Sequence, residues 1–146
     1  MEIIHSDIWG PAQTPTINGK RYYITFIDDY TRFIWVYFLK EKSEALNRFM
    51  DFKTYVEKQY GQWIKCLRTD GGGEYVSHAF EDYLRKHGIR RQLTCRYTPQ
   101  QNGVAERKNR VICEVARAML NEKNMPNHFW AEACATAVYV LNKTPT

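Results

Sequence analysis

Two neighbouring segments, residues 21–28 and 33–39, constrain the fold more than any other part of the sequence. Both are dense in aromatic and β-branched residues, and only the short stretch 29–32 separates them. Such residues favour strands, and so short a connection joins antiparallel neighbours. Their near-continuous apolar sequence is typical of strands covered on both faces. We therefore predict a β-hairpin whose strands lie well inside a sheet.

The rest of the chain alternates between shorter strand patterns and helical patterns. Apolar residues recur at helical spacing after Ser43, an expected N-cap, and stop at Gly61. Strands 2–9 and 63–69 are expected to be parallel neighbours, because a hairpin and a crossover helix separate them. The order predicts an α/β domain with a mixed five-stranded sheet flanked by helices. Beyond the hairpin, strands are expected at 2–9, 63–69 and 89–93, and helices at 43–60, 78–87, 104–120 and from Pro126 onward.

Charge is distributed unevenly along the chain. The net charge is +5, but residues 85–117 hold nine Lys and Arg against two acids. A basic segment in an otherwise near-neutral domain favours a polyanionic partner, although a solvated cationic surface explains it equally well. No apolar run approaches the length of a membrane span, so we expect no membrane partner. The four cysteines form no Cys-x-x-Cys pair, which favours reduced packing thiols over a zinc site.

The segment 97–120 joins a polar loop to a long helical pattern. The loop ends at Asn102-Gly103, and the helix begins with Glu106 in its first turn. A helical projection predicts one buried stripe and one exposed face that carries a single carboxylate among cations. The predicted buried stripe is Val104, Val111, Ile112, Val115 and Met119, and the predicted exposed face is Glu106, Asn109, Arg110, Cys113 and Arg117.

Three acids stand out by position. Asp7 lies near the end of the first strand, Asp70 directly follows the strand 63–69, and Glu106 begins the helix. Parallel neighbouring strands end at the same edge of a sheet, so both aspartates are expected there. Each acid alone has an ordinary structural explanation, as a turn residue beside glycine or as a first-turn acid. Asp28 and Asp29 are interpreted as turn residues of the hairpin.

The order of these acids, with 35 residues between Asp70 and Glu106, resembles the Asp-Asp-35-Glu triad of the retroviral integrase catalytic core. The closest likeness is to integrases of copia-type LTR retrotransposons, and it covers nearly the whole chain. The supporting motifs are His-Ser-Asp-Ile-Trp-Gly-Pro at 5–11, Phe-Ile-Asp-Asp-Tyr-Thr-Arg at 26–32, Arg-Thr-Asp-Gly-Gly-Gly-Glu-Tyr at 68–75, Tyr-Thr-Pro-Gln-Gln-Asn-Gly-Val-Ala-Glu-Arg at 97–107 and Phe-Trp-Ala-Glu-Ala at 129–133.

This resemblance implies an RNase H-like fold and an integrase that processes DNA 3′ ends and joins them to target DNA. It assigns Asp7, Asp70 and Glu106 as catalytic residues that hold two Mg²⁺ or Mn²⁺ ions, with Asp7 shared between them. Hard divalent cations prefer carboxylate oxygens, so these residue types suit that chemistry. Gly71 departs from the family, which commonly has Asn after the second acid.

The resemblance also implies partners and a setting. Double-stranded DNA is the expected partner, with Gln101, Asn102, Asn109 and Arg110 as candidate contacts. These four could instead only solvate the loop and helix. A homo-dimer or higher oligomer, action in the nucleus and a possible cytoplasmic virus-like particle follow from the likeness alone. Residues 1–146 are expected to be one catalytic core domain from a longer Gag-Pol polyprotein.

Two other functions fit the same sequence. The chain could be a silent or domesticated fragment that binds nucleic acid or a partner without catalysis. RNase H-type cleavage of RNA–DNA hybrids shares the same metal chemistry. The Gln-Asn-Gly loop at 101–103, which runs into the Glu106 helix, favours integrase over RNase H.

Overall fold

A computed structural model of the chain describes residues 1–94 and 103–144. Its centre is a five-stranded mixed sheet with the strand order β3-β2-β1-β4-β5. Antiparallel pairing joins β1, β2 and β3, and parallel pairing joins β1, β4 and β5. The strands are β1 (Ile3–Trp9), β2 (Tyr22–Asp28), β3 (Ile34–Leu39), β4 (Cys66–Thr69) and β5 (Arg90–Leu93).

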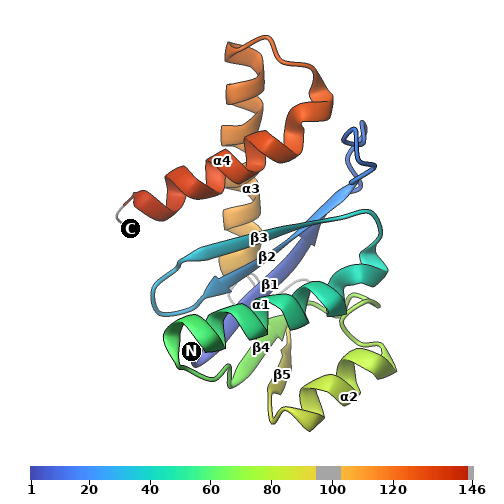
Figure 1. Ribbon diagram of the computed structural model, residues 1–146, viewed down its shortest axis with the longest axis vertical. Coiled ribbons are helices and arrows are strands. Elements are labelled where there is room, and N and C mark those ends of the chain that lie inside the picture. Colours follow the sequence, from blue (N-terminus) through green and yellow to red (C-terminus); the bar gives the residue numbers. More distant parts are fainter. Residues whose placement is uncertain (95–102, 145–146) are drawn as a thin grey trace.

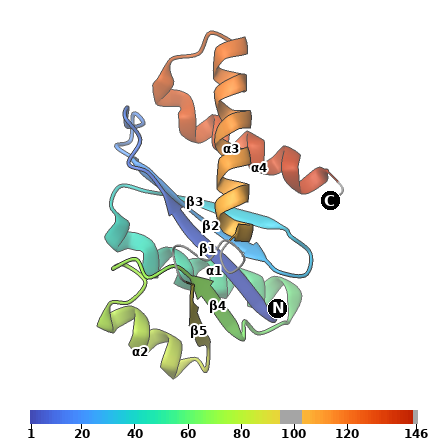
Figure 2. The same cartoon turned by 180° about the vertical axis from the view of Figure 1, so that it is seen from behind.

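In the part of the chain that the structure describes, four helices cover the two faces of this sheet (Figures 1 and 2). One face of the sheet packs against α1 and α2, and the other packs against α3. The helix α4 crosses α3 and contacts β3. None of the described helices is long and apolar enough to cross a membrane. The helices are α1 (Ala45–Tyr60), α2 (His78–Lys86), α3 (Gly103–Glu122) and α4 (Trp130–Lys143), with short 3₁₀ turns η1 (Lys42–Glu44) and η2 (Asn127–Phe129).

The alternation of side chains along β2 explains why the sheet has two different cores. Ile24 and Phe26 face α1, where Phe26 stacks on Phe52 with ring centroids 4.5 Å apart. Tyr23 and Ile27 face the opposite way, toward α3 and α4. Because successive side chains of a strand point to opposite faces, one strand contributes to both layers.

The predicted mixed five-stranded α/β fold is confirmed, including the parallel neighbours β1 and β4. The hairpin is also confirmed, but β3 lies at the sheet edge and its four central residues are only half-buried. Ser43 does not cap α1, because the chain enters that helix through η1, whose N-cap is Glu41. Gly61 ends α1 as expected, in a left-handed conformation with φ of 63°.

The predicted faces of α3 need a correction. Asn109 and Cys113, which the helical projection placed on the exposed face, are buried, and so are Ala105 and Ala116. The valines of the predicted stripe are only half-buried. The helix packs against both the sheet and α4, so its buried arc is wider and turned relative to the apolar stripe.

Candidate active site

Asp7 lies on β1 at the edge where the parallel strands end. It pairs with Thr25 on β2, and β1 pairs with β4 through Ile3 to His5. Continuing the β1–β4 register past His5 aligns Asp7 with Asp70, the residue directly after β4. The sheet therefore brings the two aspartates to neighbouring positions at one edge, as the sequence predicts.

A partly buried hydrogen-bond chain holds the Asp7 carboxylate. The Nδ2 of Asn109 donates to Asp7 Oδ2 at 2.8 Å, and the Oγ1 of Thr25 donates to Asn109 Oδ1 at 3.2 Å. The Tyr23 hydroxyl donates to the Asn109 carbonyl at 3.4 Å. Asn109 is 5% exposed, and both ends of its amide are engaged. It is therefore a positioning residue for Asp7, the predicted exposure of its side chain is wrong, and its contact with DNA stays a prediction.

The electrostatic environment of Asp7 disfavours its charge. Burial raises the pKa of Asp7 from 3.8 to about 6, and the nearby Asp70 carboxylate adds to the rise. The hydrogen bond from Asn109 opposes it, while Glu106 contributes a smaller increase. Both other acids are thus near enough to repel an ionised Asp7, and such a cluster is relieved by a bound cation.

The loop after β4 orients Asp70 through its own backbone. The Gly72 N–H donates to Asp70 Oδ1 at 2.9 Å. A Cβ at position 72 would lie 3.0 Å from that oxygen and 2.9 Å from Glu74 Oε1, so glycine allows this close approach. Position 71 differs, because a Cβ there would meet nothing within 4 Å.

Glu106 lies in the first turn of α3 and is exposed. It lines a pocket of about 340 Å³ together with Asp7, Asn109, Arg110 and Arg117. The pocket therefore combines two of the predicted catalytic acids with two exposed arginines that lie two turns apart on α3, and the exposed Glu114 of the same helix also lines it. The predicted contact of Arg110 with DNA stays a prediction.

The structure brings the three acids together only in pairs. Asp7 and Glu106 share the pocket, and Asp7 aligns with Asp70, which does not line it. Within residues 1–94 and 103–144, no three His, Cys, Asp or Glu side chains are close enough to hold one metal ion together. The donor chemistry still fits Mg²⁺ or Mn²⁺, because the acids near Asp7 offer only carboxylate oxygens and accumulate negative charge. Gln101 and Asn102 lie outside the described residues.

His5 lies two residues before Asp7 on β1 and contacts Asp29, at the end of the hairpin strand β2. Its ring is fully buried, and Nε2 lies 2.6 Å from Asp29 Oδ1. Burial lowers the pKa of His5, so its imidazole is neutral and its Nε2–H donates to the Asp29 carboxylate. Asp28 accepts hydrogen bonds from the backbone and hydroxyl of Thr31. Both hairpin acids are therefore structural, as predicted.

Thr25 and Tyr23 support the site, and sequence reasoning did not identify them. A usable signal was present, since Tyr23, Thr25 and Ile27 alternate along β2 and Thr25 is the polar member of an apolar set. A hydroxyl at such a position needs a buried partner. Its partner lies 84 residues away on α3, at Asn109, which no local pattern indicates.

Comparison with solved structures agrees with this architecture. The chain is similar to a simian T-cell lymphotropic virus intasome chain, with a TM-score of 0.77, 19% identity, and coverage of 99% of this chain and 49% of that one. It is also similar to the HTLV-2 integrase catalytic core domain in complex with magnesium, with a TM-score of 0.69, 18% identity, and coverage of 99% and 86%. The fold is the RNase H-like fold of retroviral integrase catalytic cores.

Sequence comparison then identifies the family. The profile described as "Integrase core domain" matches residues 1–99, and the chain belongs to this family. It is 45% identical over 146 residues to the retrovirus-related Pol polyprotein from transposon TNT 1-94 of Nicotiana tabacum. It is 39% identical, again over 146 residues, to the corresponding polyprotein from transposon RE2 of Arabidopsis thaliana. These matches cover all of this chain but only 11% and 10% of those polyproteins.

Proposed function

We propose that this domain is the catalytic core of a retrotransposon integrase, a polynucleotidyl transferase that trims element DNA 3′ ends and joins them to target DNA. The observation that carries the proposal is the Asp7 environment, in which Asp70 and Glu106 both raise the pKa of a carboxyl group that Asn109 orients. Membership of the integrase core family and the named Pol polyprotein relatives support the same activity.

The reaction is in-line displacement at phosphorus. In trimming, a water oxygen bonds to phosphorus as the bond to the 3′ oxygen breaks, and the released 3′ oxygen takes up a proton. In joining, that 3′ hydroxyl attacks a phosphodiester of target DNA and a target 3′ hydroxyl leaves. Two Mg²⁺ or Mn²⁺ ions, when bound by Asp7, Asp70 and Glu106, would activate the attacking oxygen and stabilise the leaving one. The related HTLV-2 core was solved with magnesium, which supports this choice of cofactor.

Residues of this chain have separate tasks around those acids. Asn109 and Thr25 fix the Asp7 carboxylate, and the Gly72 N–H fixes that of Asp70. Arg110 and Arg117 supply positive charge beside Glu106, where the backbone of bound DNA would pass. Double-stranded DNA is the proposed partner, a homo-oligomer the proposed assembly, and the nucleus the proposed place of action.

The test is cleavage of a branched DNA integration intermediate in Mn²⁺. The wild-type chain should release the joined strand, and Asp70→Asn should lower the rate of release by about a thousandfold or more. Asp82→Asn is the matched control, because Asp82 is an exposed acid on α2 whose recorded ion pair is with Arg85. Equal loss in both variants would show that folding and not a specific carboxylate is affected.

A catalytically silent fragment that binds nucleic acid or a partner is the alternative. It is favoured by the lack of a three-residue metal cluster in the described residues. In that case the wild-type chain should bind DNA with no Mn²⁺-dependent product, and Mn²⁺ should leave its melting temperature unchanged. A metal-induced rise in melting temperature that Asp7→Asn abolishes would contradict this alternative.

A further inference from the structure

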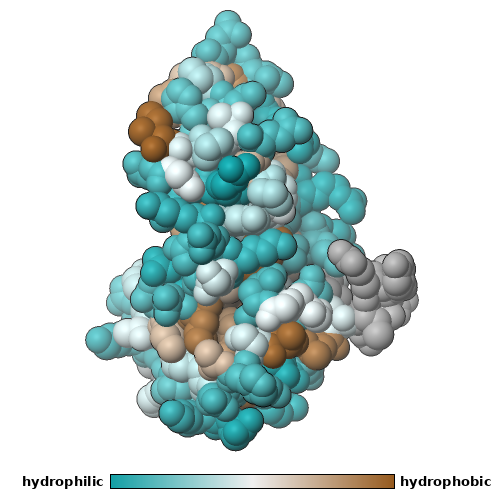
Figure 3. Space-filling model, turned by 90° about the vertical axis from the view of Figure 1, so that its right-hand side faces the viewer, coloured by the Kyte–Doolittle hydropathy of each residue, from teal (hydrophilic) through white to brown (hydrophobic). Residues whose placement is uncertain are grey.

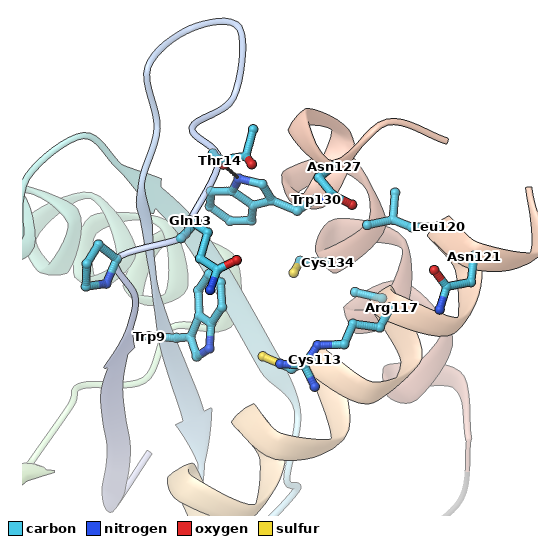
Figure 4. Close-up of a pocket in the computed structure, with 13 residues that line it drawn as sticks. Trp9, Gln13, Thr14, Cys113, Arg117, Leu120, Asn121, Asn127, Trp130 and Cys134 are labelled. Carbon is cyan, nitrogen blue, oxygen red and sulfur yellow. Dashed lines mark hydrogen bonds between the residues drawn. The ribbon is translucent and has the colours of Figure 1, made fainter. Parts of the chain in front are cut away.

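A second pocket, of about 580 Å³, adjoins the one that holds Asp7 and Glu106 (Figure 4). It lies between the end of β1 with the loop that follows, on one side, and α3 and the start of α4, on the other. Trp9, Cys113 and Arg117 line both pockets. The two spaces are therefore neighbours along one continuous surface, and a strand bound at the acids would pass close to the second pocket.

Two tryptophan rings form a fixed wall of this pocket. Trp9 and Trp130 have centroids 5.4 Å apart, and Trp9 also stacks on Tyr23 at 5.2 Å with an interplanar angle of 20°. The indole Nε1 of Trp130 donates to the Thr14 carbonyl at 2.8 Å. These contacts hold both rings in place without a ligand. Preorganised aromatic faces are the usual platform for an unpaired nucleobase.

The remaining lining is polar at the rim and carries no negative charge. Gln13, Asn121 and Asn127 are exposed and offer amide groups that can both donate and accept hydrogen bonds. Arg117 is the one charged residue among those that line the pocket. It forms no ion pair with any described residue, so its guanidinium can meet an added anion.

We propose that this pocket binds one unpaired base of the DNA strand that passes the active site, with the phosphate of that nucleotide at Arg117. The base would stack against the exposed part of the Trp9 ring, beside the buried Trp130 ring, and the rim amides would meet its edge. This proposal rests on the proposed function, since it takes DNA as the substrate. Bases in overhangs or frayed ends would enter first, because they need no unpairing. The volume lies within the range of about 300–1,000 Å³ that is usual for small-ligand sites.

The rim makes an apolar ligand a poorer fit. An apolar occupant would leave the amides of Gln13 and Asn121 and the Arg117 charge without new partners. A nucleotide can use the aromatic rings, the amides and the arginine together. Because the two pockets share lining residues, its strand can run from Asp7 and Glu106 into the second pocket. The side of the molecule drawn in Figure 3 is largely hydrophilic, with a few hydrophobic patches.

Photocrosslinking tests the contact directly. A duplex with a short single-stranded overhang, carrying 5-iododeoxyuridine in the overhang, is irradiated with the wild-type chain, and the adduct is mapped by mass spectrometry. The expected adduct is on Trp9 or Trp130. An adduct only on Trp35, Trp63 or another residue, from a chain that cleaves branched DNA, would overturn the pocket proposal and leave the proposed function standing. Absence of any DNA binding would overturn both.

Affinity measurements provide a second test that does not depend on one side chain. Trp9→Leu should weaken binding of overhang DNA about tenfold and weaken blunt duplex much less, because the stacked base is lost only from the overhang. The double variant Gln13→Ala with Asn121→Ala removes exposed side chains, so it should keep the fold and weaken overhang binding about threefold. Arg117→Gln should weaken the binding of both DNAs. It should also reduce the slope of log affinity against log salt concentration by about one, because one phosphate contact is lost.

Lys123→Gln is the control, because Lys123 follows α3 and lines neither pocket. It should bind both DNAs like the wild type. Equal losses for overhang and blunt duplex in Trp9→Leu and in the double variant would contradict the proposal. Competition by a free mononucleotide at concentrations that leave blunt-duplex binding intact would support it. Failure of the mononucleotide to displace the overhang would contradict it.

Discussion

The two faces of the sheet differ in what they bury. The face under α1 and α2 is closed by aromatic and aliphatic side chains, with Phe26, Phe49 and Phe52 all fully buried. The face under α3 and α4 also has an apolar core, but it buries the polar residues Thr25 and Asn109 and half-buries Asp7 beside them. The first face supplies stability, and the second holds a partly buried carboxyl group at a cost in stability.

This contrast teaches how one strand can serve two purposes. Along β1, Ile4 packs in the α1 layer and the Ser6 hydroxyl meets Tyr75 at 2.8 Å, while Asp7 faces α3. The period of two separates these environments by a single residue. The carboxylates can therefore be crowded together because the opposite face already holds the sheet rigid.

The largest expected effect is on the closed face. Phe26→Ala should lower the free energy of unfolding by about 3–5 kcal/mol, because Phe26 stacks on Phe52 and has no exposed surface. Urea unfolding measures the loss. The control is Tyr30→Ala, which removes an aromatic ring that is 94% exposed and should change little. A loss below about 1 kcal/mol for Phe26→Ala would contradict the picture of a tightly packed face.

On the other face, Asp7→Asn should increase stability. The pKa of Asp7 is raised from 3.8 to about 6, so the folded state keeps a proton that the unfolded state has lost, and stability falls as pH rises between about 4 and 6. The rise corresponds to about 3 kcal/mol, which the variant should regain at pH 8 without metal. Below pH 4 the two proteins should be equally stable.

Urea unfolding in a chelator at pH 4 and pH 8 measures this difference. Asp82→Asn serves as the control, because that carboxylate is exposed and lies on α2. The same variant that gains stability should lose Mn²⁺-dependent DNA cleavage. A destabilised Asp7→Asn at pH 8 would mean that the carboxylate is favourably paired, and the proposed difference between the faces would be wrong.

The sequence predicted the closed face, under α1 and α2, better than the face under α3 and α4, which is the open face because the pocket with Asp7 lies there. Phe49, Phe52 and Val56 follow a helical period, and the hairpin strands are visible from their composition, so local pattern was enough there. The carboxylate edge was also predictable, because strand order and parallel pairing bring Asp7 and Asp70 together. The error at Asn109 has a physical cause. Its burial depends on partners from two distant strands, and polar identity alone argued for the surface.

Asn109→Ala tests whether the open face depends on that amide. The change removes the donor to Asp7 and the acceptor for Thr25, and should destabilise by about 1–3 kcal/mol. It should also raise the pKa of Asp7 further, because the Asn109 hydrogen bond lowers it. The stability profile against pH should therefore shift to higher pH. Asn121→Ala, at an exposed position of the same helix, should show neither effect.

A smaller effect is expected where α1 ends on the closed face. Gly61 adopts φ of 63°, and a Cβ there would meet nothing within 4 Å. Gly61→Ala should therefore cost about 1 kcal/mol, from the left-handed backbone alone. Gly61→Asn should cost less, because Asn tolerates this conformation. Gly73→Ala, where the structure shows neither strain nor close contact, is the matched control for urea unfolding.

The smallest expected change in stability is at the edge of the open face. Gly71 has open space around its Cα and no left-handed φ, so Gly71→Asn should alter the free energy of unfolding by less than about 0.5 kcal/mol. Activity is a separate measurement at this position. The new amide would lie beside Asp70, where it could restrain the carboxylate and increase Mn²⁺-dependent cleavage. Gly72→Asn is the contrasting variant, because its Cβ would crowd the Asp70 and Glu74 oxygens at 3.0 and 2.9 Å. Equal losses of cleavage in both variants would mean that the whole loop, and not the contact at position 72 alone, is intolerant of side chains.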